Sequence, residues 1–389
     1  MRVLSVFGTR PEAIKMAPVV LRLAETAGIE SRVCVTGQHR QMLDQVLTLF
    51  GIEPHHDLKI MSDAQDLYEL TARSLLGLRG VLAGERPALV LVQGDTTTCF
   101  TAALAAFYAD IPVGHIEAGL RTGNLRAPFP EEANRALVTR VTDWHFAPTE
   151  RARQKLREEA VPDENILVTG NTVIDALLMV RDLIAADPPR RWRDQFGDAL
   201  YQRITDDSRR LILITGHRRE NFGQGFVDMC NAMRDLAGRH PDWDLVYPVH
   251  LNPNVQRPVR GILDGLANVF LIDPLDYAPF VWLMDRADIL LTDSGGVQEE
   301  APSLGKPVLV MREVTERPEA VEAGTVRLVG ANRERIVQGI ETVLLDRSTY
   351  DAMSRAHNPY GDGHASERIV EFIRAHYLGH GKKRTLGKV

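Results

Sequence analysis

The feature that most constrains this chain is a regular alternation of short apolar runs with longer amphipathic segments. The run Ala88–Gln93 (ALVLVQ) is almost wholly apolar, which is typical of a strand buried on both faces of a parallel sheet. Because parallel strands are joined by helical crossovers, the alternation predicts an α/β protein with doubly wound sheets. In the first half we expect strands at Arg2–Phe7, Ser31–Thr36, Ala88–Gln93, Pro112–Ile116 and Trp144–Ala147, and helices at Pro11–Ala27, Thr98–Ala109 and Glu131–Val141.

The alternation stops after a segment at Thr172–Ala186 and then begins again. Pro188–Arg193 (PPRRWR) is typical of a linker, and Arg210–Thr215 (RLILIT) is the next expected strand. The 389 residues also fit two domains of about 100–200 residues each. Further strands are expected at Leu245–Pro248, Val269–Ile272, Ile289–Thr292 and Val308–Val310. We therefore expect Rossmann-like domains at 1–170 and 171–364, a last helix at Ala365–Leu378 and a basic tail at 379–389.

Charge and hydropathy exclude several classes of protein. No apolar run reaches about 18 residues, so we expect no transmembrane helix. The net charge of −6 disfavours a nucleic-acid binder, and we interpret the basic residues of Gly381–Arg384 as a solvated end. The N-terminus lacks the pattern of a secretory signal and already resembles a strand and a loop. A cytoplasmic protein is therefore expected.

The three cysteines, Cys34, Cys99 and Cys230, lie far apart in the sequence. They form neither a disulfide framework nor the spacing of a zinc site. We expect buried free thiols in a reducing compartment and no metal.

In doubly wound sheets, ligands bind at the carboxyl ends of the strands. The first strand ends in Gly8-Thr9-Arg10-Pro11-Glu12, so Arg10 and free backbone N–H groups are expected at a helix N-terminus, which suits a phosphate. An ordinary turn with a surface arginine is the alternative.

A second turn of this kind follows the expected strand Ile289–Thr292. Ser294, Gly295 and Gly296 let a ligand approach the backbone closely, and Glu300 further along the helix suits ribose hydroxyls. The alternative is a capping serine and a solvated glutamate.

Three carboxylates follow or flank strands of the first half: Asp95, Glu117 and Glu131. Carboxylates at one sheet edge suit general acid–base chemistry. Glu131 alternatively stabilises a helix dipole, and Asp95 alternatively forms a turn with the threonines that follow it.

Histidines end two successive strands of the second half. His217 is followed by two arginines, of which Arg218 is the first, and His250 ends the next strand. These side chains suit acid–base chemistry or the neutralisation of a diphosphate, with purely structural histidines as the alternative. No histidine spacing indicates a metal site, and no serine or cysteine motif indicates a nucleophile. Pattern alone thus predicts a two-domain α/β enzyme for an anionic, nucleotide-bearing ligand, without its reaction.

The motifs taken together resemble one family along almost the whole chain. They are FGTRPEAIKMAP (7–18), TGQHRQMLDQVL (36–47), VQGDTTT (92–98), PVGHIEAGLRT (112–122), PFPEEANR (128–135), TGNTVIDAL (169–177), GHRREN (216–221), LTDSGGVQEEAPSLGKPVLVMR (291–312), TERPEAVEAGT (315–325) and NPYGDGHASERIV (358–370). In this order they resemble the non-hydrolysing UDP-N-acetylglucosamine 2-epimerases of bacteria.

The resemblance implies a glycosyltransferase-B-like fold, in which two Rossmann-like domains face each other across a cleft that binds the substrate. It also implies that the last helix packs back on the first domain, that the protein is a homodimer, and that it needs no metal or redox cofactor. The implied reaction converts UDP-N-acetylglucosamine (UDP-GlcNAc) into UDP-N-acetylmannosamine (UDP-ManNAc) for cell-surface polysaccharide synthesis. UDP is eliminated to give 2-acetamidoglucal and then adds back, with a proton delivered to the other face of C2.

The resemblance also implies roles for residues at matching positions. Asp95, Glu117 and Glu131 are implied as the acid–base set, and His217 as the residue acting at the diphosphate. Glu300 is implied at the ribose, Phe280 at the uracil and Arg135 beside the carboxylates, with a core aromatic as the alternative for Phe280. The implied UDP-sugar contacts are Arg10, Lys15, Arg135, Leu275, Phe280, Ser294, Gly295, Gly296, Glu300 and Arg317.

Many bacterial members also bind a second UDP-GlcNAc as an activator. The matching positions here are Gln38, Gln41, Arg218 and His250, with Glu131 touching both ligands. Those members carry an arginine where Met61–Asp66 has none, which sets this chain apart from them.

Three alternatives stay open on the sequence. A close relative could act on another UDP-sugar, such as a diacetamido sugar acid. A hydrolysing epimerase would release free N-acetylmannosamine, although such enzymes often carry a fused sugar kinase and this chain ends without one. A nucleotide-sugar-binding protein without epimerase activity is the third, and the presence of all three carboxylates and His217 disfavours it.

Overall fold

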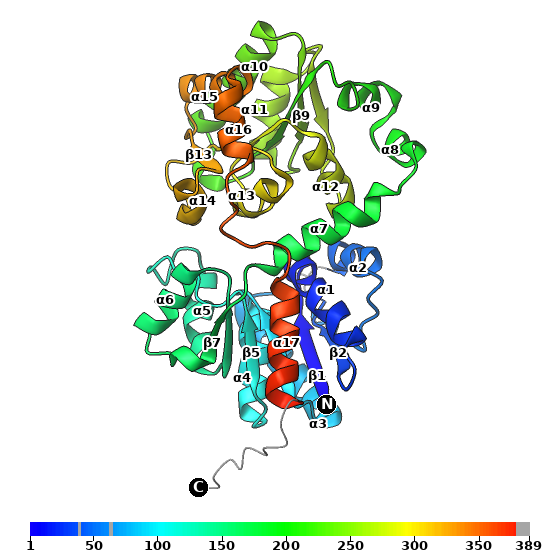
Figure 1. Cartoon of the computed structure of the whole chain (residues 1–389), viewed down its shortest axis with the longest axis vertical. Coiled ribbons are helices and arrows are strands. Elements are labelled where there is room, and N and C mark those ends of the chain that lie inside the picture. Colours follow the sequence, from blue (N-terminus) through cyan, green and yellow to red (C-terminus); the bar gives the residue numbers. More distant parts are fainter. Residues whose placement is uncertain (38–39, 62–64, 379–389) are drawn as a thin grey trace. The chain divides into compact units, whose positions relative to one another are not determined.

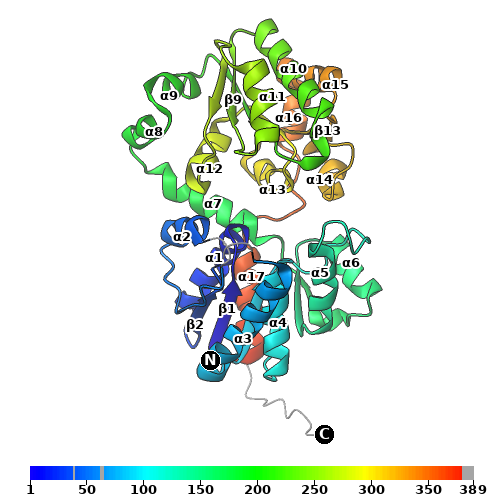
Figure 2. The same ribbon diagram turned by 180° about the vertical axis from the view of Figure 1, so that it is seen from behind.

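The computed structural model describes residues 1–37, 40–61 and 65–378, without the side chains of residues 40 and 41 (Figures 1 and 2). The chain divides into two compact units. The first unit comprises Met1–Ala176 and the segment that begins at Gly361, and the second comprises Leu177–Tyr360. The division falls within one helix, α7 (Thr172–Ala185).

The first unit is built on a seven-stranded sheet with the order β3-β2-β1-β4-β5-β6-β7. Every neighbouring pair is parallel, so the predicted fold class is confirmed for this unit. All five residues of β4 are buried, as its unbroken apolar sequence predicted. The strands are β1 (Arg2–Phe7), β2 (Glu30–Val35), β3 (His56–Asp57), β4 (Leu89–Gln93), β5 (Val113–Ile116), β6 (Trp144–Ala147) and β7 (Ile166–Val168).

Helices and one 3₁₀ turn connect these strands. The helices are α1 (Arg10–Glu25), α2 (Arg40–Leu49), α3 (Leu67–Glu85), α4 (Thr97–Tyr108), α5 (Glu131–Arg140), α6 (Glu150–Glu158) and α7, and the 3₁₀ turn is Asp163–Asn165. Alanines of α4 pack against the apolar side chains of β1 and β4 in the core of this unit, where small residues let helix and sheet approach closely. The last helix, α17 (Ala365–Tyr377), lies beside α1 in both views (Figures 1 and 2). Its Phe372 contacts Trp144 of β6, with ring centroids 5.1 Å apart.

The second unit contains a six-stranded parallel sheet with the order β10-β9-β8-β11-β12-β13, which confirms the predicted fold class here too. Its strands are β8 (Arg210–Thr215), β9 (Trp243–Pro248), β10 (Val269–Ile272), β11 (Ile289–Thr292), β12 (Val308–Val310) and β13 (Val326–Leu328). The helices are α8 (Pro189–Phe196), α9 (Asp198–Ile204), α10 (Gln224–Arg239), α11 (Pro253–Leu263), α12 (Tyr277–Arg286), α13 (Gly295–Glu300), α14 (Pro318–Glu322), α15 (Arg333–Leu345) and α16 (Arg347–Ser354), with 3₁₀ turns at Arg219–Asn221 and Ala301–Leu304.

The predicted linker at 188–193 is wrong, because the structure forms helix α8 there. Pro189 occupies the first turn, where its missing N–H costs no hydrogen bond. The buried ring of Trp192 stacks on Trp282 of α12, with centroids 4.7 Å apart. Burial of this single large ring fixes the helix in a segment whose proline and arginine content favours a linker.

Across the described ranges, no helix is both long enough and apolar enough to cross a membrane.

Candidate functional site

The strand order of each sheet defines where a ligand is expected to bind. In the first sheet the order reverses between β1 and β4, and in the second between β8 and β11. At such a switch point the connections leave in opposite directions and open a crevice at the carboxyl ends of the strands. The sequence-predicted residues Arg10 and Asp95 follow β1 and β4, and His217 and Ser294 follow β8 and β11. Most of the predicted residues therefore lie at or beside one of these two switch points.

Glu117 follows β5, the neighbour of β4, and is the most tightly held of the predicted carboxylates. Both of its oxygens accept hydrogen bonds from Lys15 Nζ of α1, at 2.6 and 2.7 Å. Gln93 Nε2 donates to Oε2, and Asn171 Nδ2 donates to Oε1 at 3.1 Å. Its backbone lies in the left-handed region, with φ of 64°. A glutamate in that conformation is uncommon, and strained backbone of this kind concentrates at functional sites.

Asp95 is held by two side chains of α5. Its Oδ2 accepts from Arg135 Nε at 2.9 Å and lies 2.6 Å from Arg135 Nη2. Its backbone carbonyl accepts from Asn134 Nδ2 at 2.8 Å. The threonine turn proposed as the alternative does not involve the Asp95 side chain, because Thr96 caps α4 instead.

Glu131 is the first residue of α5, one helical turn before Arg135. Its Oε2 is buried and has no hydrogen-bond partner among the described residues. A buried carboxylate oxygen without a partner is costly, so this atom is available to a ligand or a water. Because Asp95, Glu117 and Glu131 differ in their partners, their environments differ although their chemical type is the same.

Two of the implied substrate contacts of the first unit have different surroundings. Arg10 is the first residue of α1 and is partly exposed, as expected for a residue that meets a ligand at a helix N-terminus. Lys15 was predicted as a UDP-sugar contact, and in the structure its ammonium group is paired with Glu117.

In the second unit, Asp293 is a buried residue that pattern reasoning missed. It is fully buried at the end of β11, and its Oδ2 accepts from the backbone N–H groups of His217 and Arg218, both at 2.8 Å. Its Oδ1 lies 3.5 Å from His217 Nδ1. Asp293 thus fixes the turn after β8 and orients the imidazole. Its position directly after a buried strand is the signal that could have identified it.

The imidazole of His217 also stacks on His250, with ring centroids 5.5 Å apart. Burial lowers the pKa of His217, an effect that the carboxylate of Asp293 opposes and that His250 and Arg218 reinforce. His217 is therefore neutral at pH 7, and an anionic ligand placed beside it would favour its protonation.

The turn after β11 brings cationic side chains to a glycine. A Cβ added at Gly295 would lie 3.8 Å from both Arg218 Nη2 and Arg317 Cζ. Arg317 is paired with the buried Glu299, and Arg218 Nε is buried without a partner in the described part of the chain. Ser294 occupies the N-cap position of α13, but its hydroxyl does not cap the helix. Two guanidinium groups beside a side-chain-free turn suit a phosphate group.

The remaining predicted contacts lie on and around α12. Glu300 is buried and accepts from Tyr277 Oη at 2.7 Å. Phe280 on α12 and Leu275 just before it are both partly buried. A partly buried Phe280 fits either of the two roles considered for it.

The residues predicted for an activator cannot all be placed. Gln38 and the side chain of Gln41 lie outside the described residues. His250 is exposed, and its Nδ1 accepts from Asn252 N at 3.1 Å. No cluster of three potential metal ligands occurs within residues 1–37, 40–61 and 65–378.

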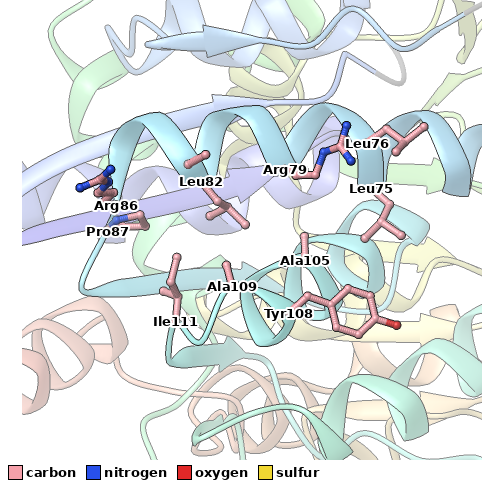
Figure 3. Close-up of a pocket in the computed structure, with 11 residues that line it drawn as sticks. Leu75, Leu76, Arg79, Leu82, Arg86, Pro87, Ala105, Tyr108, Ala109 and Ile111 are labelled. Carbon is pink, nitrogen blue, oxygen red and sulfur yellow. The ribbon is translucent and has the colours of Figure 1, made fainter.

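One cavity lies away from all of these residues. It has a volume of about 730 Å³ and lies between α3 and α4 of the first unit (Figure 3). Apolar side chains such as Leu75, Leu82 and Ile111 dominate its lining, to which Arg79 and Tyr108 also contribute. None of the predicted site residues lines it.

Comparison with known proteins decides the family. Residues 21–374 match the family model described as UDP-N-acetylglucosamine 2-epimerase. The UDP-N-acetylglucosamine 2-epimerase of Escherichia coli K12 is 59% identical over 374 residues, which are 96% of this chain and 98% of that protein. This chain belongs to the UDP-N-acetylglucosamine 2-epimerase family. The resemblance found in the sequence is confirmed, and the chain is an isomerase of this family.

Solved structures agree with this membership. The crystal structure of the Neisseria meningitidis UDP-GlcNAc 2-epimerase bound to UDP-GlcNAc has a TM-score of 0.87 and 51% identity, and the match covers 96% of this chain and 99% of that one. A glycosyltransferase of kitacinnamycin, 14% identical with a TM-score of 0.63 over 96% of this chain and 98% of that one, shows the shared fold alone.

Proposed function

We propose that this chain interconverts UDP-GlcNAc and UDP-ManNAc. The observation that carries the proposal is a pair of carboxylates held at the ends of the neighbouring strands β4 and β5, Asp95 by Arg135 and Glu117 by Lys15. Family membership supports the substrate, since the N. meningitidis member was crystallised with UDP-GlcNAc.

The chemistry of the substrate explains why such residues are needed. No carbonyl lies next to C2 of the sugar, so direct removal and return of the C2 proton lacks a stabilised carbanion. In the proposed reaction a base takes the C2 proton while the C1–O bond breaks. The C2–H electron pair becomes the C1=C2 double bond of 2-acetamidoglucal, and the C1–O pair leaves with UDP. Addition of UDP to C1 and of a proton to the opposite face of C2 completes the epimerisation.

The proposal gives these residues the roles that the resemblance implies. Asp95, Glu117 and Glu131 supply proton transfer on the two faces of C2, and each well-placed group is worth about 10²–10⁴-fold in rate. His217 acts at the departing diphosphate and Arg317 contacts it, which stabilises the charge of the leaving group. Arg10, Ser294, Gly295 and Gly296 contact phosphates, Glu300 contacts the ribose, and Leu275 and Phe280 lie at the base.

The wider role follows the same resemblance. The proposal also predicts a homodimer in the cytoplasm. It further predicts that a second UDP-GlcNAc acts as an activator, and that the UDP-ManNAc produced supplies cell-surface polysaccharide synthesis. Of these predictions, the activator site is the one whose residues the structure describes least, because Gln38 lies outside the described residues.

A product assay tests the proposal. Purified protein is incubated with UDP-GlcNAc, without NAD or added metal, and the nucleotides are separated by anion-exchange chromatography. We expect a mixture of UDP-GlcNAc and UDP-ManNAc, and a loss of about 10²–10⁴-fold in turnover for Asp95→Asn with the fold unchanged by circular dichroism. Free N-acetylmannosamine with UDP would instead indicate a hydrolysing enzyme, and an unaltered substrate would contradict the proposal.

A further inference from the structure

Glu132 is a buried carboxylate to which the sequence analysis gave no role. It is the second residue of α5, next to Glu131, and only 2% of its side chain is exposed. Its Oε1 accepts from the backbone N–H groups of Thr122 and Gly123, at 2.9 and 3.0 Å. Its Oε2 accepts from Arg135 Nη1 at 2.9 Å. Both oxygens are therefore committed to specific donors.

These contacts continue through Arg135 to Asp95. The guanidinium of Arg135 uses Nη1 for Glu132 and its Nε and Nη2 for Asp95. A planar guanidinium held on one edge by Glu132 presents its other donors in one fixed orientation. Glu132 thus determines where Arg135 aims, and Arg135 determines where the Asp95 carboxylate lies.

The same carboxylate ties two segments of the site together. Thr122 and Gly123 lie in the loop that follows β5 and begins with Glu117. Glu132 joins that loop to the start of α5, where Glu131 lies. Its position in the first turn also suits the helix dipole, but these three hydrogen bonds come from Thr122, Gly123 and Arg135 and not from the free N–H groups of α5.

We propose that Glu132 is a positioning residue for Asp95, acting through Arg135. It does not touch the substrate. The inference rests on the proposed function only in that Asp95 acts on the sugar.

The test compares the full-length protein with its Glu132→Gln variant. The amide keeps the volume but turns an N–H group toward a donor. We expect kcat to fall about 10–100-fold, the range found for residues that orient a functional side chain, while KM for UDP-GlcNAc changes less than about threefold.

Two further variants separate positioning from packing. Glu132→Asp keeps the charge but is too short to reach all three donors, so it should lower kcat about fivefold or more while KM changes less than about threefold. Glu85→Gln removes a partly buried carboxylate, 12% exposed, that pairs with Arg2 at the start of β1, and should leave kcat and KM unchanged.

The outcomes distinguish the positioning role of Glu132 from the proposed function. Wild-type kcat in Glu132→Asp, or a loss in Glu132→Gln that Glu85→Gln reproduces, would overturn the positioning role. If Glu132→Gln does not fold, the Glu132→Asp result decides alone. A rise in KM as large as the fall in kcat in a folded Glu132→Gln variant would also count against it. A wild-type protein without epimerase activity would overturn the proposed function and this inference together.

Discussion

The Lys15–Glu117 pair joins residues 102 positions apart in the sequence, and most of the surface of both side chains is buried. Removing one partner of a buried ion pair leaves the other charge uncompensated, which costs about 3–5 kcal/mol in fully buried cases. Gln93 and Asn171 still donate to Glu117 when Lys15 is removed and reduce that cost.

The prediction is a non-additive double-mutant cycle. Lys15→Met should lower the free energy of unfolding by about 2 kcal/mol or more, and Glu117→Gln should lower it too. The double variant should lose at least about 1 kcal/mol less than the sum of the two single losses, since no lone charge is left behind. Urea unfolding followed by circular dichroism measures all three, and strictly additive losses would show that the pair is not energetically coupled.

The sequence indicated residue types better than it indicated partners. Asp95 and Glu117 could be found because they directly follow apolar runs that form strands β4 and β5. Their pairing with Arg135 and Lys15 depends on strand order and helix packing, which no local pattern encodes. For the same reason the motif directed attention to Glu131, whereas burial shows that its neighbour Glu132 holds Arg135.

At the scale of elements, the turn between β1 and α1 brings the backbone very close to two threonines. A Cβ added at Gly8 would overlap Thr36 Oγ1 and lie 2.5 Å from Thr98 Oγ1. The two hydroxyls hydrogen-bond to each other at 2.9 Å in a buried position, so neither can move away easily. Gly8 is therefore required by a close approach of backbone to side chains.

Gly8→Ala is predicted to destabilise the protein by about 1–3 kcal/mol through overpacking. A matched control is Gly80→Ala in the interior of α3, where an added Cβ meets nothing within 4 Å. That change should stabilise by about 0.5–1 kcal/mol, since alanine is the better helix former. Thermal melts of the two variants should shift in opposite directions, and a neutral Gly8→Ala would contradict the packing described here.

Apolar runs predict strand bounds well. Strands β1, β6, β8, β10, β11 and β12 have the predicted bounds, because buried runs flanked by polar residues are distinctive. Strand β3 has two residues and was missed, because so short a segment shows no periodicity. The sequence of α8 predicts a linker, because the burial of Trp192 depends on its contact with the distant Trp282, which no local pattern encodes.

At the scale of the whole molecule, two buried histidines make stability depend on pH. His115 and His145 lie side by side on β5 and β6. Burial lowers the pKa of His115 to about 4 and that of His145 to about 3. His145 also faces His115 and Arg121, whose charges act in the same direction. Below the ordinary histidine pKa of about 6.5 the unfolded chain binds protons that the folded chain does not, so folding stability falls as pH falls.

His145→Gln should reduce this dependence. Between pH 6 and pH 5 the wild type should lose about 1 kcal/mol more stability than the variant, because the unfolded histidine is mostly protonated there. Burial raises the pKa of Glu12 and of Asp175, which acts in the opposite direction, but both proteins share those groups. Urea unfolding at the two pH values is the measurement. The exposed His357→Gln is the control and should keep the wild-type dependence. Equal pH dependence in the wild type and His145→Gln would contradict the prediction.

The proposed epimerisation requires that C2 loses its proton to a base of the protein and receives a proton on the opposite face. Proton NMR of UDP-GlcNAc incubated with the protein in D₂O, without NAD or metal, tests it most directly. We expect a UDP-ManNAc signal in which C2 carries solvent deuterium, because the base that takes the C2 proton exchanges with solvent before the return step. UDP-ManNAc that keeps its original C2 hydrogen throughout would contradict the account.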